Sequence, residues 1–169
     1  GLVGSEMGIR DGTHDDDDDG TVTCSIGFTD ANGNAGVAVT AVTSGSGVTH
    51  DDTVPTLTSV GIAGNGDSAT RSMDGSTVTV SVTASETIGT PTCDMEFTSN
   101  NDATNAESIN NPQNNDWTCA VLADDDDAEG AVVFSIGFTD SAGNAGVAVT
   151  STTDGSSVTH DDTVPTLST

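Results

Sequence analysis

One long stretch occurs twice in this chain of 169 residues, and the two copies lie 110 positions apart (Ser25 against Ser135). Aligned without gaps, residues 20–57 and 130–167 agree at 29 of 38 positions. A period near 110 residues is too long for a solenoid repeat and matches one small β-sandwich domain. We therefore interpret the chain as a segment of a tandem array of such domains.

The repeat also predicts where the domains begin and end. Residues 1–53 are expected to be the C-terminal part of a preceding repeat, with only its last three strands (E, F and G). Residues 54–162 are expected to form one complete repeat, and residues 163–169 to start the following one. Pro55 lies at the first of these boundaries, where it interrupts no central strand.

Apolar and polar residues alternate along several short segments, which is typical of half-buried β-strands. The clearest case is residues 77–84, which alternate Thr or Ser with Val or Ala. No segment has helical apolar periodicity over three turns, so an all-β fold is expected. Residues 99–113 are polar, and we expect a surface excursion there with one short helical turn near 103–109. A bulge and a small hairpin both remain open at 154–155. Strands are predicted at 21–30, 37–42, 56–62, 77–84, 90–97, 116–122, 131–140 and 147–153.

The charge balance restricts the partners of the chain. There are 27 acidic residues against two Arg and no Lys, which gives a net charge of −25. Nucleic acid and anionic membranes are excluded as expected partners because both require basic residues. The chain has no apolar run of about 18 residues, so no membrane insertion of this segment is expected. Divalent cations are the natural counter-ions.

Three segments carry a resemblance to a known family: residues 139–146 (TDSAGNAG), 154–159 (DGSSVT) and 161–167 (DDTVPTL). They resemble the tandem Ig-like repeats of large microbial cell-surface proteins and adhesins, and residues 84–91 are similar to the strand B to strand C crossing of those repeats. The resemblance implies tandem Ig-like Greek-key β-sandwiches, an extracellular, cell-surface location, a role as stalk modules beside neighbouring repeats, and Ca²⁺ at the junctions. The long acidic runs and the three cysteines depart from the family pattern.

Acidic turns and linker carboxylates are the candidate Ca²⁺ ligands. In an Ig-like sandwich, the A–B and E–F loops and the end of strand G share one pole, while the B–C and F–G loops of the next repeat face it. Ca²⁺ takes six to eight oxygen ligands, which suits carboxylates from two loops and a linker. The alternative is a solvated acidic face, as in proteins adapted to high salt. The candidate ligands are Asp15, Asp16, Asp17, Asp18, Asp19, Asp51, Asp52, Glu86, Asp140, Asn144, Asp124, Asp125, Asp126, Asp127, Asp161 and Asp162.

Two of the three cysteines are predicted to form a disulfide. Cys93 and Cys119 both fall in the inward register of strands that lie on opposite sheets of this fold. We favour a disulfide between them over two buried thiols because an extracellular compartment is oxidising. Cys24 occupies the position of Phe134 in the repeat, where a buried thiol and a pairing outside the chain both remain open. Trp117 is expected to be a core residue.

His50 and His160 each precede two aspartates. Such a group at a linker is able to ligate Zn²⁺, whereas the simpler interpretation is a surface histidine. A catalytic triad is not indicated because nothing in the sequence fixes a nucleophile beside a base. We do not expect an enzyme.

The sequence therefore predicts a structural extracellular module, a Ca²⁺-stiffened stalk or fibre of a cell-surface adhesin or appendage. One alternative is a filament subunit in which residues 163–169 supply a strand to a like chain. A second alternative is a glycan- or protein-binding module that uses residues 99–113. A spacer attached to an enzyme is the third.

Overall fold

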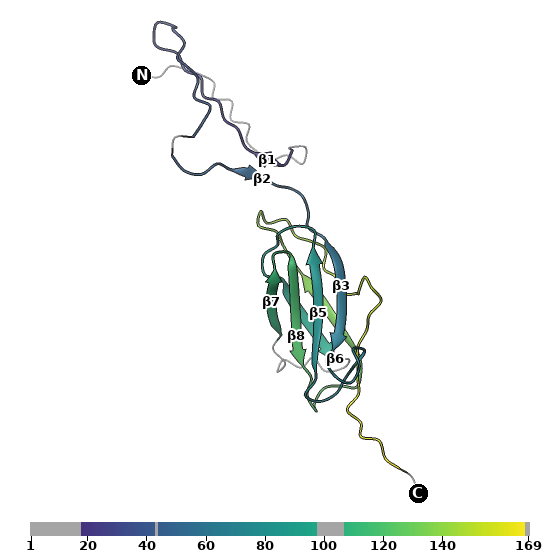
Figure 1. Cartoon of the computed structure of the whole chain (residues 1–169). Helices are drawn as coiled ribbons and strands as arrows, with labels where there is room; N and C mark the ends of the chain where they lie inside the picture. The colour runs from purple at the N-terminus through teal and green to yellow at the C-terminus, as the bar shows by residue number, and fades with distance from the viewer. Residues whose placement is uncertain (1–17, 43, 98–106, 168–169) are drawn as a thin grey trace. The chain divides into compact units, whose positions relative to one another are not determined.

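The computed structural model describes residues 18–42, 44–97 and 107–167. The chain divides into two compact units, Gly1–Thr53 and Val54–Thr169, which are described separately. The regular structure of the described residues consists of β-strands, and no described residue is helical (Figure 1). The all-β prediction is confirmed.

The second unit contains two four-stranded sheets that pack as two layers (Figure 1). The strands of the first sheet are antiparallel and have the order β3-β5-β8-β7: β3 (Leu57–Gly64), β5 (Thr77–Ala84), β8 (Asp116–Leu122) and β7 (Ser108–Gln113). The second sheet has the order β4-β10-β9-β6: β4 (Arg71–Ser72), β10 (Thr159–His160), β9 (Gly130–Gly137) and β6 (Thr92–Phe97).

The core lies between these two sheets. Alternate residues of β5 point into it, and their partners come from the inward register of β9. A disulfide between Cys93 in β6 and Cys119 in β8 crosses from one sheet to the other, joining the pair that the sequence analysis favoured. Trp117 is partly buried and packs against this core. The buried residues that β5 and β9 contribute to the core are Val78, Val80, Val82, Ala84, Val132, Phe134 and Ile136.

Two sequence predictions for this unit are wrong. Residues 108–113 are not an irregular excursion but form the edge strand β7, and the described part of the expected helical turn lies in or next to that strand. Residues 147–153 do not form a continuous strand. Val149 bridges to Ile136 of β9, whereas Thr153 donates its backbone N–H to the carbonyl of Val60 in β3 at 2.8 Å. The segment thus passes from the edge of one sheet to the edge of the other.

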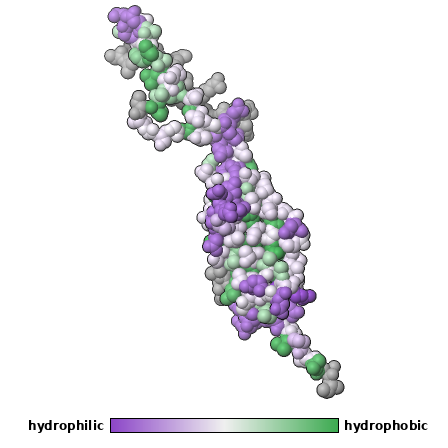
Figure 2. Space-filling view, viewed as in Figure 1, coloured by the Kyte–Doolittle hydropathy of each residue, from purple (hydrophilic) through white to green (hydrophobic). Residues whose placement is uncertain are grey.

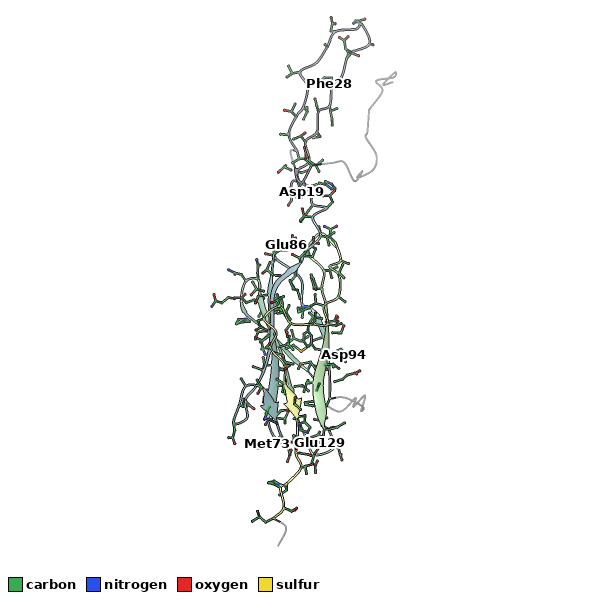
Figure 3. All side chains as sticks on the ribbon, turned by 90° about the vertical axis from the view of Figure 1, so that its right-hand side faces the viewer. Asp19, Phe28, Met73, Glu86, Asp94 and Glu129 are labelled. Carbon is green, nitrogen blue, oxygen red and sulfur yellow. A yellow bond between two sulfur atoms is a disulfide. The ribbon has the colours of Figure 1, made fainter. Side chains whose placement is uncertain are left out.

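The chain enters and leaves the second unit at opposite ends. β3 begins beside the end of β5, since Leu57 pairs with Ala84, and Glu86 lies at this same end (Figure 3). At the other end, His160 of the last strand pairs with Gly130, next to Glu129 (Figure 3). The sandwich therefore spans the distance between the two points of attachment.

The described residues of the first unit, 18–42 and 44–53, form a ribbon with little regular structure. Its strands are β1 (Gly20–Thr21) and β2 (Thr49–His50), which pair antiparallel, and two isolated bridges join Ile26 to Val39 and Thr29 to Ala35. The strands predicted at 21–30 and 37–42 are reduced to these contacts. The expected half-burial of their apolar face is also wrong. Figure 2 shows apolar side chains on the surface of this ribbon.

Candidate functional site

The closest group of possible metal ligands in the first unit consists of Asp19, His50 and Asp52. One ligand atom from each lies within 4.8 Å of the others, and His50 Nε2 is 3.9 Å from Asp52 Oδ2. The pairing of Gly20 with His50 between β1 and β2 creates this proximity, because it sets the end of the acidic turn beside the linker. The sequence analysis named both aspartates as ligands and treated the histidine separately.

Asp19 fastens the linker that follows β2. Its Oδ1 accepts a hydrogen bond from the backbone N–H of Asp52 at 2.8 Å, and its Oδ2 accepts one from the Thr53 hydroxyl. The Thr53 hydroxyl, and after it the Asp52 amide, hold the pKa of Asp19 below its usual value. The carboxylate is therefore ionised at neutral pH and holds two consecutive linker residues.

The second unit repeats this contact with Glu129. The Thr163 hydroxyl donates a hydrogen bond to Oε1 of Glu129, as the Thr53 hydroxyl does to Asp19. Sequence reasoning missed Glu129, although it stands 110 positions after Asp19 and directly precedes the aligned stretch. We call the contacts Asp19–Thr53 and Glu129–Thr163 the linker clasps.

Asp140 is used by its own turn. Its Oδ1 accepts hydrogen bonds from the backbone N–H groups of Ala142, Gly143 and Asn144 at 2.7–2.9 Å, and its Oδ2 accepts one from Asn144 Nδ2. Burial by itself raises the pKa of this carboxyl, but the hydrogen bonds from Asn144, Gly143 and Ala142 together outweigh it and lower the pKa. Asp30 closes the corresponding turn of the first unit in a similar way.

The acidic turn between β8 and β9 is also internally hydrogen-bonded. Asp127 is buried, and its Oδ2 accepts the backbone N–H of Asp124 at 2.9 Å. Asp124 in turn accepts the N–H of Asp126 through Oδ1, while Asp125 is exposed. These carboxylates stabilise the turn, so a cation there competes with the backbone for the same oxygen atoms.

Of the remaining candidate ligands, Glu86 and Asp140 lie together in the second unit, since one carboxylate oxygen of each is within 4.8 Å of the other. Asp51 and Asp161 each accept the N–H of the threonine two residues later, at 3.2 Å. Asp18 is exposed, and Glu86 and Asp162 are partly buried. Residues 15–17 lie outside the described residues.

Within the first unit, the donor set fits a cation at Asp19 and Asp52, where each oxygen of Asp19 accepts one hydrogen bond. Their carboxylates are ligands that Ca²⁺ prefers, whereas the imidazole of His50 suits Zn²⁺ better. A cation at Glu86 and Asp140 stays a prediction, and it would share the oxygens of Asp140 with the four hydrogen bonds that they accept.

The prediction of surface histidines is wrong. His160 is fully buried, with Nδ1 3.2 Å from the hydroxyl of Ser72 and its ring edge-on to Phe97. The side chain of His50 is 14% exposed. His160 is thus a core residue of the second unit, because the pairing of β10 between β4 and β9 turns it inward. Cys24 also departs from one expectation, since it is an exposed free thiol and not a buried one.

Comparison with protein-family models, with curated proteins and with solved structures finds no match. Within the part of the chain that the structure describes, we find no helix of the length and apolarity that crossing a membrane requires.

Proposed function

We propose that this chain is a non-enzymatic, extracellular structural module, a spacer built from tandem Ig-like β-sandwiches of a cell-surface protein. The observation that carries the proposal is the position of the two chain ends on the second unit, at opposite ends of one sandwich (Figure 1). Repeats joined in this way add their lengths along the chain. A spacer needs that arrangement, whereas an isolated binding domain does not.

The strand order supports the Ig-like assignment. The sheet β3-β5-β8-β7 corresponds to strands A-B-E-D of the constant-type immunoglobulin fold, and β6, β9 and β10 correspond to C-F-G. The short β4 is an addition to this scheme, because it pairs parallel to β10 at the sheet edge.

The cysteines support an extracellular location. Disulfides persist in oxidising compartments and are rare in reducing ones. The Cys93–Cys119 bridge joins the two sheets of the sandwich, so it opposes their separation when the ends are pulled apart.

Cation binding at the clasped linker completes the proposal. Ca²⁺ bound by Asp19 and Asp52 neutralises charge where an acidic turn meets the linker, and it fixes the direction in which the chain leaves the first unit. The further contribution of Glu86, Asp140 and Asn144 to a junction site stays a prediction from the sequence.

Single-molecule force spectroscopy of the whole chain, tethered through its two ends, tests the spacer role. We expect one discrete unfolding step from the second unit. The disulfide encloses a sequence separation of 26 residues, so reduction should lengthen this step by about 90 Å at about 3.5 Å per residue. A chain that extends smoothly, without a discrete step, has no folded unit that bears tension, and that result would contradict the proposal.

A further inference from the structure

The turn at Asp154-Gly155, where the sequence does not distinguish a bulge from a small hairpin, lies between β9 and β10. The Thr152 hydroxyl donates a hydrogen bond to the carbonyl of Ser156, and the Ser156 N–H donates to Oδ1 of Asp154, both at 2.9 Å. Gly155 has a φ of 74°, a backbone conformation that favours glycine. The turn is therefore closed by its own hydrogen bonds. We call residues 152–156 the strap.

The strap bonds to the edge of β3 that faces away from β5. Thr153 donates its N–H to the carbonyl of Val60 at 2.8 Å, and its hydroxyl accepts the N–H of Val60 at 2.9 Å and donates to the Val60 carbonyl at 3.2 Å. The Ser156 hydroxyl accepts the N–H of Ile62 at 2.8 Å. Because β5 pairs along the opposite edge, β3 is held on both sides.

Asp154 positions the strap on β3. Hydrogen bonds from the hydroxyl and then from the backbone N–H of Ser156 hold the pKa of the Asp154 carboxyl below its usual value, so the carboxylate is ionised at neutral pH. A Cβ on Gly61 would lie 2.8 Å from Oδ2 of Asp154. The carboxylate therefore packs on β3 at the residue between the two that the strap bonds, and glycine is suited to such a close approach.

The strap joins two segments that run in the same direction through the second unit. β3 begins at the entry end, where Leu57 pairs with Ala84. The strap leads into β10, which ends at the opposite, exit end, where His160 pairs with Gly130. Tension along the chain therefore pulls β3 and the strap in opposite directions along their length. In this geometry the hydrogen bonds between them bear the load together and do not break one after another.

We propose that the strap is a mechanical latch, which fastens the first strand of the second unit to its last and sets the tension at which this unit unfolds. The hydrogen bonds of Thr153 and Ser156 lie between the segment where force enters and the segment where it leaves. Val158 and His160 are fully buried, so the strap does not slide toward the exit end without pulling both side chains from the core. This inference rests on the proposed spacer role, because only a chain under tension uses a latch.

Unfolding of the whole chain at constant force, tethered through its two ends, tests the latch. Thr153→Val combined with Ser156→Ala should raise the unfolding rate of the second unit under force by about tenfold or more, because three hydrogen bonds of the two hydroxyls are lost. Thr153→Ser retains the hydroxyl and should unfold at the rate of the original chain. If the double variant does not fold, Ser156→Ala alone should still raise the rate severalfold, since it removes one bond.

Thr83→Val is the matched control, because it removes a hydroxyl that is equally well bonded but lies away from the strap. The Thr83 hydroxyl donates to Oδ1 of Asp116 at 2.8 Å, across the paired strands β5 and β8. The control and the double variant should both lower the urea midpoint, followed by Trp117 fluorescence. Under force, however, Thr83→Val should unfold at nearly the rate of the original chain, because its bond does not lie between β3 and the strap.

The possible failures of the latch and of the spacer role are distinguishable. A double variant that unfolds in a discrete step, at the same rate under force as Thr83→Val, would overturn the latch and leave the spacer role intact. An original chain that extends smoothly, without a discrete step, would overturn the spacer role and the latch with it.

Discussion

The Thr163 hydroxyl donates a hydrogen bond to the carboxylate of Glu129, so the linker three residues after β10 is held by the turn that precedes β9. The same clasp joins Thr53 to Asp19 in the first unit. Both pairs are exposed, and exposed hydrogen bonds contribute little to global stability. The consequence we expect is local, namely control of how freely the linker moves.

Removing the second clasp should loosen the linker and leave the sandwich intact. In Thr163→Val, the ¹⁵N order parameters of residues 163 and 164 should fall below about 0.6, the range of flexible backbone. The Trp117 unfolding midpoint should stay unchanged. Glu129→Ala should have the same two effects, because it removes the other partner of the bond. Order parameters equal to those of the original chain would show that the clasp does not restrain the linker.

Acid should weaken the turn that Asp140 closes. The folded pKa of this carboxyl is lowered, so its contribution to stability is fully present above the unfolded value near 3.9 and is lost as the pH falls through the folded pKa. We therefore expect Asp140→Asn to lower the unfolding midpoint at pH 7 and to differ progressively less from the original chain below about pH 4.

Asp94→Asn, at an exposed position of β6, is the control for this experiment. It should have almost no effect on the midpoint at pH 7, since surface substitutions usually change stability by less than about 0.5 kcal/mol. A pH profile of Asp140→Asn that runs parallel to that of the original chain down to about pH 2 would refute the assigned role of Asp140.

A phenyl ring packs directly on a glycine in each unit, and the two copies should respond differently to a methyl group. A Cβ on Gly146 lies 2.1 Å from the ring of Phe138, and a Cβ on Gly36 lies equally close to Phe28. Phe138 is buried and has no room to move, so Gly146→Ala should destabilise the second unit by about 1–3 kcal/mol. Phe28 is half exposed, so Gly36→Ala should cost less.

Urea unfolding followed by Trp117 fluorescence measures the destabilisation that Gly146→Ala causes in the second unit. For Gly36→Ala, the destabilisation of the ribbon is measured from the loss of its amide signals in urea. If both substitutions lower the free energy of unfolding equally, burial does not explain the difference, because buried Phe138 and half-exposed Phe28 would then be equally constrained.

The Cys93–Cys119 bridge should stabilise the second unit by roughly 3.5 kcal/mol, from the chain entropy of a loop with a sequence separation of 26 residues. Cys93→Ala combined with Cys119→Ala should lower the free energy of unfolding by about this amount. Cys24→Ser, which changes the exposed thiol of the first unit, is the matched control and should leave the second unit unchanged. Equal stability of the double variant and the control would show that the bridge does not stabilise the second unit.

Strand prediction succeeded where a strand alternates strictly. The expected bounds 77–84 and 116–122 coincide with β5, whose burial alternates along its whole length, and with β8, whose burial alternates from Thr118 to Val121. It failed for β7, because its sequence SINNPQ lacks alternation and this edge strand is held by backbone bonds to β8.

The sequence predicts burial and hydrogen-bond partners less well than strands, because both depend on which other segments pack against a residue. The alternation of Val22, Ile26 and Phe28 identifies an apolar face, but it does not say whether a second sheet covers that face. Glu129 was missed because its role depends on pairing across β9 and β10 and on the position of Thr163 after them. Sequence charge likewise does not reveal that the Asp140 carboxylate is occupied by its own turn.

Calorimetric titration of Ca²⁺ into the whole chain, at about 150 mM NaCl to screen diffuse surface charge, tests the central claim most directly. We predict a saturable heat of binding that Asp19→Asn combined with Asp52→Asn weakens by about tenfold or more, because these carboxylates supply the ligand oxygens. The matched control, Asp125→Asn combined with Asp126→Asn in the β8–β9 turn, should bind as the original chain does. Absence of saturable binding at this salt concentration, or an equal loss of affinity in both double variants, would contradict a cation-stiffened linker and leave the acidic runs as a screened surface.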